Sequence, residues 1–212
     1  MPGIANLTVY GFQQRINRFN QRYVNDWNEW LDTPPNERPS QLGVVMRRWQ
    51  ACRPNKMRRT LAENQHDAPY LEDLIAQAAQ HLQVLQDFDI RENAAFTTCN
   101  CGSLVQLWNI FQNLSYDGLA LNGLAGVVGI SKAVLLLTDG RIGPAFDSNV
   151  RKQLKLVNIG NSRQWISALK TASRDIHAFE ANNNTTLQQA APHPYARLQC
   201  GRIYDMALGP GG

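Results

Sequence analysis

The sequence predicts an all-α protein. Apolar residues recur every three or four positions in most segments, no long stretch alternates with period two, and the connections between segments are short. Of the 212 residues, 43% are hydrophobic and 18% are charged, which is typical of a folded globular chain. A chain of this length builds a substantial core as one domain or as two lobes. We expect an N-terminal helical lobe over residues 1–98 and a second lobe over 99–212.

The first helix is expected over residues 12–30, where six apolar or aromatic side chains are spaced by three or four. The stretch "DTPPNERPS" ends it, because prolines lack the amide donor and block helix continuation. Ser40 is the expected N-cap of a second helix that stops before Pro54. A third helix is expected from about Pro69 to Phe88, with leucines along its apolar side.

The second half of the chain continues the pattern. Ser103 is the expected N-cap of the helix "SLVQLWNIFQNL", and residues 161–181 again have helical spacing. Between them, glycines among small apolar residues predict two short helices, over 119–128 and 131–137, joined by a tight turn. Free amides at such a turn suit a phosphate group, as the N-terminus of a helix does.

A loop with two glycines and a proline, "TDGRIGPAFDS", follows this apolar segment. Asp147 comes at its end, directly before the helical stretch "SNVRKQL". The aspartate is expected either to cap that helix, which is worth about 1 kcal/mol, or to project into a cleft.

The net charge is +4, and the basic residues are concentrated in one segment, "RRWQACRPNKMRR", which has no acidic residue. Such a patch can follow the phosphates of a nucleic acid, although an ordinary solvated surface is the alternative. Its basic residues are Arg47, Arg48, Arg53, Lys56, Arg58 and Arg59.

The remaining polar residues predict neither a metal site nor a cofactor site. The four cysteines are expected as free thiols, the "CNC" spacing is too short for a common zinc knuckle, and the histidines are scattered. Asp205 is expected to form an ion pair with Arg202 on a helix surface. No apolar run approaches the roughly 20 residues of a membrane span, and no signal peptide is recognisable, so we expect a cytoplasmic protein without membrane contact.

The order of hairpin, Gly/Pro-rich loop and aspartate resembles the helix-hairpin-helix DNA glycosylase superfamily. The residues that carry the likeness are "LAGVVGISKAVLLL" and "GRIGPAFDSNV", and "GRIYDMALG" resembles the closing helix of that group. The likeness covers roughly residues 100–208 and is nearest to bacterial proteins akin to 8-oxoguanine DNA glycosylases.

The resemblance implies a protein that binds double-stranded DNA, flips out a modified base and cleaves its N-glycosidic bond without a cofactor. Asp147 would stabilise the positive charge that grows on the sugar. Lys132 would be the nucleophile of a bifunctional enzyme. The hairpin residues Gly126, Gly129 and Ser131 would contact DNA, together with the basic segment.

The position of Lys132 departs from the family pattern. Two valines separate Gly126 from Gly129 where the family has one residue, and Lys132 lies only fifteen positions before Asp147. Either the loop is shortened and the lysine still reaches the cleft, or the lysine role is missing. The alternatives to a glycosylase are an inactive DNA-binding module of the same fold, and a helical interaction or regulatory protein with no nucleic-acid role.

Overall fold

The all-α prediction is confirmed. The structure is a computed structural model that describes residues 3–52, 56–66, 68–116 and 123–209, and these residues form helices and loops with no strand. The α-helices are α1 (Val9–Asn17), α2 (Gln21–Asp32), α3 (Arg38–Arg48), α4 (Leu71–Val84), α5 (Thr98–Phe111), α6 (Val127–Leu137), α7 (Ser148–Gln153), α8 (Ser162–Asn183), α9 (Leu187–Ala190) and α10 (Cys200–Leu208). The 3₁₀ helices are η2 (Asn93–Ala95), η3 (Gln112–Leu114) and η4 (His193–Tyr195).

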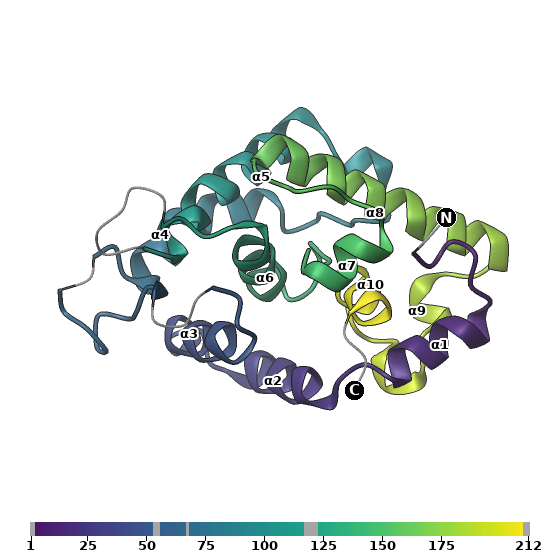
Figure 1. The fold of residues 1–212 in the computed structure, drawn as a ribbon, viewed down its shortest axis with the longest axis horizontal. Helices are drawn as coiled ribbons and strands as arrows, with labels where there is room; N and C mark the ends of the chain where they lie inside the picture. The colour runs from purple at the N-terminus through teal and green to yellow at the C-terminus, as the bar shows by residue number, and fades with distance from the viewer. Residues whose placement is uncertain (1–2, 53–55, 67, 117–122, 210–212) are drawn as a thin grey trace.

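Helix α6 is the central helix of the fold and packs against both α3 and α5 (Figure 1). Every residue from Gly129 to Leu136 is buried, as expected of a helix that is apolar nearly all round. Helix α5 also packs on α4 and α8, and α10 packs on α1, α7 and α9. Two polar residues, Ser131 and Lys132, therefore lie deep inside the molecule.

The predicted first helix is in fact two helices, because α1 ends at Asn17 and α2 begins at Gln21. Asn20 is extended, and its side-chain oxygen accepts a 3.0 Å hydrogen bond from the backbone N–H of Arg22, so it caps α2. The apolar spacing still predicted the buried side correctly, including Phe12 and Trp30.

Two predicted N-caps are wrong, because each helix begins earlier than expected. Helix α3 begins at Arg38 with Pro39 in its first turn, so Ser40 lies inside it. Helix α5 begins after Thr97, whose hydroxyl oxygen accepts a 3.1 Å hydrogen bond from Asn100 N–H, and Ser103 is buried in the helix interior. By contrast, Asn161 caps α8 at the predicted start.

The predicted glycine turn between two short helices is also wrong where the structure describes it. Residues 123–126 are not helical, α6 begins at Val127 with Gly126 as its N-cap, and Gly129 is the third helical residue. The earlier part of the predicted 119–128 helix, up to residue 122, lies outside the described residues. Within the described ranges, the helical segment before this region is α5 with η3.

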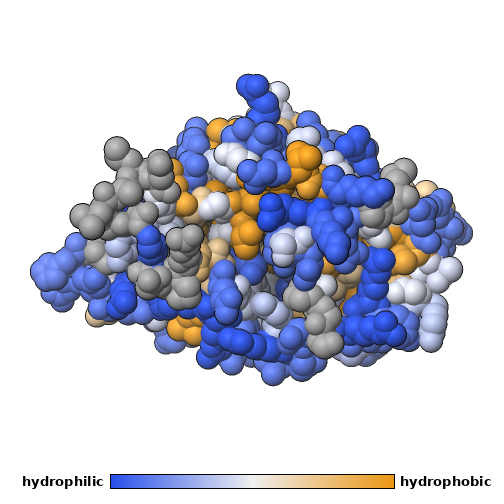
Figure 2. Space-filling view, viewed as in Figure 1, coloured by the Kyte–Doolittle hydropathy of each residue, from blue (hydrophilic) through white to orange (hydrophobic). Residues whose placement is uncertain are grey.

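The division into lobes of 1–98 and 99–212 stays a prediction, and helix contacts cross that boundary. Helix α4 packs along α5, and the amides of Ile4 and Ala5 donate to the carboxylate of Asp175 in α8, at 2.8 and 3.1 Å. The face seen in Figure 2 is mostly hydrophilic, with hydrophobic side chains in separate patches. Among the described residues, no helix is both long enough and apolar enough to cross a membrane.

Candidate functional site

Lys132 and Asp147 line the same small pocket, which we call the charged pocket. It has a volume of about 10 Å³ and lies between the α1–α2 connection, the end of α3, helix α6, the loop before α7, and α10. Its lining residues are Phe19, Tyr23, Trp49, Lys132, Ala145, Asp147, Arg202 and Asp205. Three aromatic side chains and four charged ones therefore meet at one point of the fold.

Asp147 caps α7 and also lines the charged pocket. The helix cap and the position at a cavity, which the sequence offered as alternatives, therefore occur in the same residue. Its backbone is extended, and its Oδ1 accepts a 2.9 Å hydrogen bond from Val150 N–H in the first turn of α7. The carboxylate thus lies at the positive end of a helix with its position fixed by the cap.

Lys132 is a buried amine on α6. Its side chain reaches the charged pocket, and Nζ donates a 2.8 Å hydrogen bond to the backbone carbonyl of Trp49. Burial lowers the pKa of Lys132, while Asp147 and Asp205 partly oppose that shift. Lys132 and Asp147 thus line one pocket although only fifteen positions separate them, and the role of the lysine stays a prediction.

Asp205 and Arg202 form the predicted ion pair, but the expectation of a helix-surface pair is wrong. The Arg202 Nη1 to Asp205 Oδ2 distance is 2.7 Å, and the two side chains are 1% and 9% exposed. The guanidinium also lies over the rings of Trp27 and Phe19, at 4.5 and 5.1 Å from the ring centroids. Desolvation raises the pKa of Asp205, and the charge of Arg202 opposes that shift.

The loop that leads to Asp147 is held by two side chains from other elements. Ala145 N–H donates to Asp205 Oδ1 and Phe146 N–H donates to Ser131 Oγ, each at 2.9 Å. Ser131 in turn donates to the carbonyl of Val127 at 2.6 Å. Ser131 is 2% exposed and makes both of these hydrogen bonds inside the protein, and its expected contact with DNA stays a prediction.

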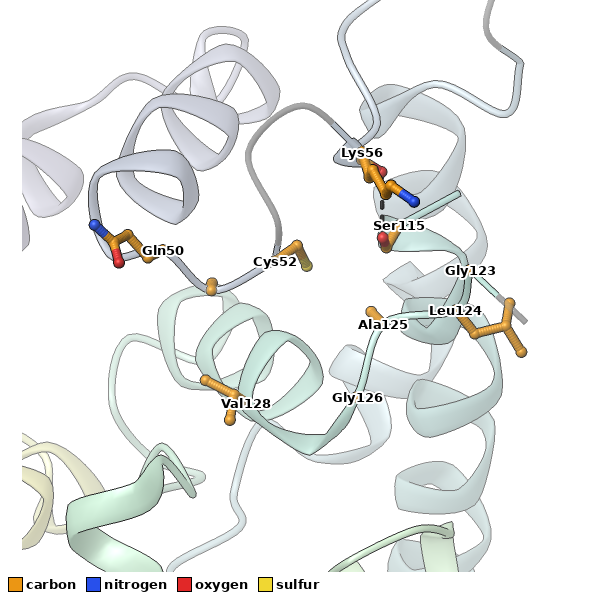
Figure 3. A pocket seen from close by; sticks show the side chains of 10 residues that line it. Gln50, Cys52, Lys56, Ser115, Gly123, Leu124, Ala125, Gly126 and Val128 are labelled. Atoms are coloured by element: carbon orange, nitrogen blue, oxygen red, sulfur yellow. Dashed lines mark hydrogen bonds between the residues drawn. The ribbon is translucent and has the colours of Figure 1, made fainter. Parts of the chain in front are cut away.

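A second and larger cavity lies at the start of α6, and we call it the helix-start pocket (Figure 3). Its volume is about 470 Å³. Gly126 and Val128 line it, so the first turn of α6 faces the cavity, where free amides and the helix dipole favour an anion. Val128 lines the helix-start pocket and Lys132 lines the charged pocket, and the two residues lie one turn apart on the same face of α6.

Gly129 serves packing more than ligand contact. A Cβ atom at this position would lie 2.7 Å from Cys52 Sγ and 3.2 Å from the carbonyl oxygen of Ala51. The segment after α3 therefore approaches α6 more closely than any side chain at 129 would permit. Cys52 is itself buried, which raises the pKa of its thiol to about 11.

The basic segment is partly neutralised by acidic residues that are remote in sequence. Arg47 pairs with Glu63 at 2.7 Å, and Arg48 pairs with Asp26 at 2.8 Å and with Glu29 at 2.7 Å. The segment itself contains no acidic residue, but the fold brings acidic side chains from other segments next to it.

The other basic residues of the segment differ in their surroundings. Arg58 donates to the carbonyl oxygens of Asn113 and Ala68, and Lys56 lines the helix-start pocket. Arg59 is exposed, and Arg53 lies outside the described residues.

The structure also describes the surroundings of the cysteines and of two tryptophans. The four cysteines are free thiols, and the described residues contain no cluster of potential metal ligands. Trp108 and Trp165 are core residues, with ring centroids 5.9 Å apart. Sequence reasoning missed the three aromatic residues of the site, Phe19, Tyr23 and Trp49, since all three fit helical apolar spacing and nothing local distinguishes them from core residues.

Comparison of the chain with family models, with curated proteins and with solved structures found no match in any of the three.

Proposed function

We propose that this protein excises a modified base from double-stranded DNA. The observation that carries the proposal is the meeting of a desolvated lysine and a helix-capping aspartate in one pocket, beside a helix N-terminus. A buried amine and a carboxylate held in a fixed direction are the two groups that such a reaction uses.

Each group has a definite part in the proposed reaction. As the bond between the base and the sugar breaks, positive charge develops on the sugar, and the carboxylate of Asp147 stabilises it. The neutral amine of Lys132 forms a bond to the same sugar carbon while the base leaves with the bond's electron pair. The nitrogen then gives one proton to the departed base and a second to the ring oxygen as the bond between the sugar carbon and that oxygen breaks, which opens the ring and leaves an imine. Burial favours this role, because it lowers the pKa of Lys132 and raises its neutral fraction.

DNA binding is assigned to the helix-start pocket, whose backbone amides suit a phosphate. The flipped nucleotide would then enter the charged pocket along the same side of α6. Ligand pockets usually measure roughly 300–1,000 Å³, whereas the charged pocket has about 10 Å³. A base therefore enters only when a lining side chain moves, and Tyr23 is the partly exposed one among the aromatic residues.

The test is a single-turnover excision assay on matched DNA duplexes that differ in one base. The set includes 8-oxoguanine, uracil, alkylated purines and an unmodified control, and release of the base is measured with the protein in excess. We expect release from at least one modified duplex and none from the control. Binding to every duplex without release would reject the proposed reaction.

An inactive DNA-binding module is the second candidate function, and one observation favours it. Lys132 is already bonded to the carbonyl of Trp49 in a pocket that has no room for a base. In that case the helix-start pocket binds DNA and the buried charges serve stability alone. The same assay, read together with DNA affinity, separates the two candidates.

A further inference from the structure

We propose that Asp205 is a positioning residue, which holds the loop that directs Asp147 into the charged pocket. The inference deepens the proposed excision and rests on it for its effect on rate. It stands on the geometry around α10, which places a second carboxylate beside the proposed site without leaving it available for chemistry.

Each oxygen of the Asp205 carboxylate has a separate task. Oδ1 accepts the backbone N–H of Ala145 at 2.9 Å, and Oδ2 accepts Nη1 of Arg202 at 2.7 Å. Both contacts are buried. Since Ala145 comes two residues before Asp147, the carboxylate fixes the backbone directly ahead of the proposed catalytic group.

Arg202 determines the charge state of this arrangement. A guanidinium keeps its proton in proteins, so it balances the charge of Asp205 inside the pocket. The other charged groups that line the pocket are Lys132 and Asp147. Asp147 is then the carboxylate that faces the pocket without an ion pair of its own in the described contacts, and it is the one placed to act on a substrate.

The loop is fixed from the side of α6 as well. Phe146 N–H donates to Ser131 Oγ, and Ser131 is the direct neighbour of Lys132. The two amides before Asp147 are therefore tied to α10 and to α6 respectively. These two hydrogen bonds together set where Asp147 lies relative to Lys132. The bond to Asp205 is the one that attaches the loop to α10.

The experiment compares Asp205→Ala with a matched control, Asp175→Ala. Asp175 is also a buried aspartate that accepts two backbone amides, from Ile4 and Ala5. It accepts the hydroxyl of Tyr204 in α10 as well, at 2.7 Å, but it does not line the charged pocket. Two quantities are measured for each variant. The first is the amide exchange of Ala145, and the second is the single-turnover rate constant for excision, with the active fraction taken from the amplitude.

In Asp205→Ala we expect the Ala145 amide to exchange at least about tenfold faster, because local opening controls exchange. The excision rate constant should fall by about ten- to a hundredfold with DNA affinity little changed, since small displacements of a reacting group have such effects. Asp175→Ala should lower the active fraction without either change. A purely structural role for Asp205 would affect the amplitude alone, so an unchanged rate constant overturns the proposal.

Asp205→Asn provides the second variant, because it retains an oxygen that accepts the Ala145 amide. We expect it to keep Ala145 protected and to lose less rate than Asp205→Ala. Equal loss of protection in both variants would show that the hydrogen bond is not the cause, and would overturn the inference. If the parent excises no base from any duplex, the proposed function fails, and the exchange of Ala145 still decides whether Asp205 holds the loop.

Discussion

The amine of Lys132 donates a hydrogen bond to the carbonyl oxygen of Trp49, so a side chain of α6 caps the C-terminal end of α3. A cation at this end of a helix is favourable, because the helix dipole is negative there. The same bond holds the amine in place, and any attack by Lys132 on a sugar requires that it break. Binding of DNA would have to release the lysine before the proposed chemistry begins.

Lys132→Gln should abolish covalent trapping. Borohydride reduces an imine between the lysine and the sugar to a permanent bond, so we expect trapped protein with the parent on a cleavable duplex and none with the variant. Lys170, an exposed lysine of α8, provides the control as Lys170→Gln. Trapping that survives Lys132→Gln would assign the nucleophile to another amine.

The rate of trapping should rise with pH, because only the neutral amine attacks the sugar. The pKa of Lys132 is lowered from 10.5, with burial as the largest cause. Its neutral fraction therefore reaches a plateau at lower pH than that of an exposed lysine. A pH–rate profile under single-turnover conditions measures this, and a rise that continues past pH 10.5 would contradict a lowered pKa.

Asp147→Asn should separate catalysis from capping. Asparagine is as good an N-cap as aspartate, so we expect α7 and the thermal stability to be retained while excision is lost. Asp147→Ala should in addition lose about 1 kcal/mol of unfolding free energy. Unchanged excision in Asp147→Asn would leave the residue with the capping role alone.

Gly129→Ala should destabilise the protein although it lies within a helix. The new methyl group would meet Cys52 Sγ at 2.7 Å and the carbonyl of Ala51 at 3.2 Å, and overpacking of this kind costs about 1–3 kcal/mol. Gly102→Ala in α5 is the matched control, because no neighbouring atom lies within 4 Å, and it should stabilise the helix by up to about 1 kcal/mol. Urea unfolding of both variants and the parent measures these changes in the free energy of unfolding. A Gly129→Ala variant as stable as the parent would contradict the close approach of Cys52 and Ala51 to Gly129.

Arg59→Gln and Arg48→Gln should differ in their effect on DNA binding. Arg48 already pairs with Asp26 and Glu29, so we expect its loss to leave the salt dependence unchanged. Arg59 is exposed, and loss of one phosphate contact should reduce the slope of affinity against salt by about one unit. Affinities over a range of salt concentrations measure both, and equal slopes for Arg59→Gln and the parent would exclude this residue from the DNA interface.

The sequence predicted the helices better than their ends. Apolar spacing identifies the buried sides of α5 and α8, because that spacing follows directly from helix geometry. The helix ends depend on which of several nearby residues acts as the cap. Thr97 caps α5 in place of the expected Ser103, and Asn20 caps α2 where one continuous helix was expected. Such competition is decided by tertiary packing that no short window contains.

Some features of the candidate site were likewise predictable from the sequence, and others were not. The aspartate at the start of α7 follows from its local sequence, since a Gly/Pro-rich loop precedes it. The burial of Arg202 and the presence of Trp49 in the pocket do not, because they require α2, α3 and α10 to meet. The ion pair of Arg202 was predictable from spacing, whereas its depth was not.

The contact between α10 and the loop before α7 limits which amino acids residue 201 can be. A Cβ atom on Gly201 would lie 2.5 Å from the carbonyl oxygen of Gly140 and 2.7 Å from the amide nitrogen of Gly143. Any larger residue at 201 would separate the two backbones and move Asp205 away from Ala145. The orientation of Asp147 thus depends on a residue without a side chain, Gly201, although Gly201 itself does not line the charged pocket.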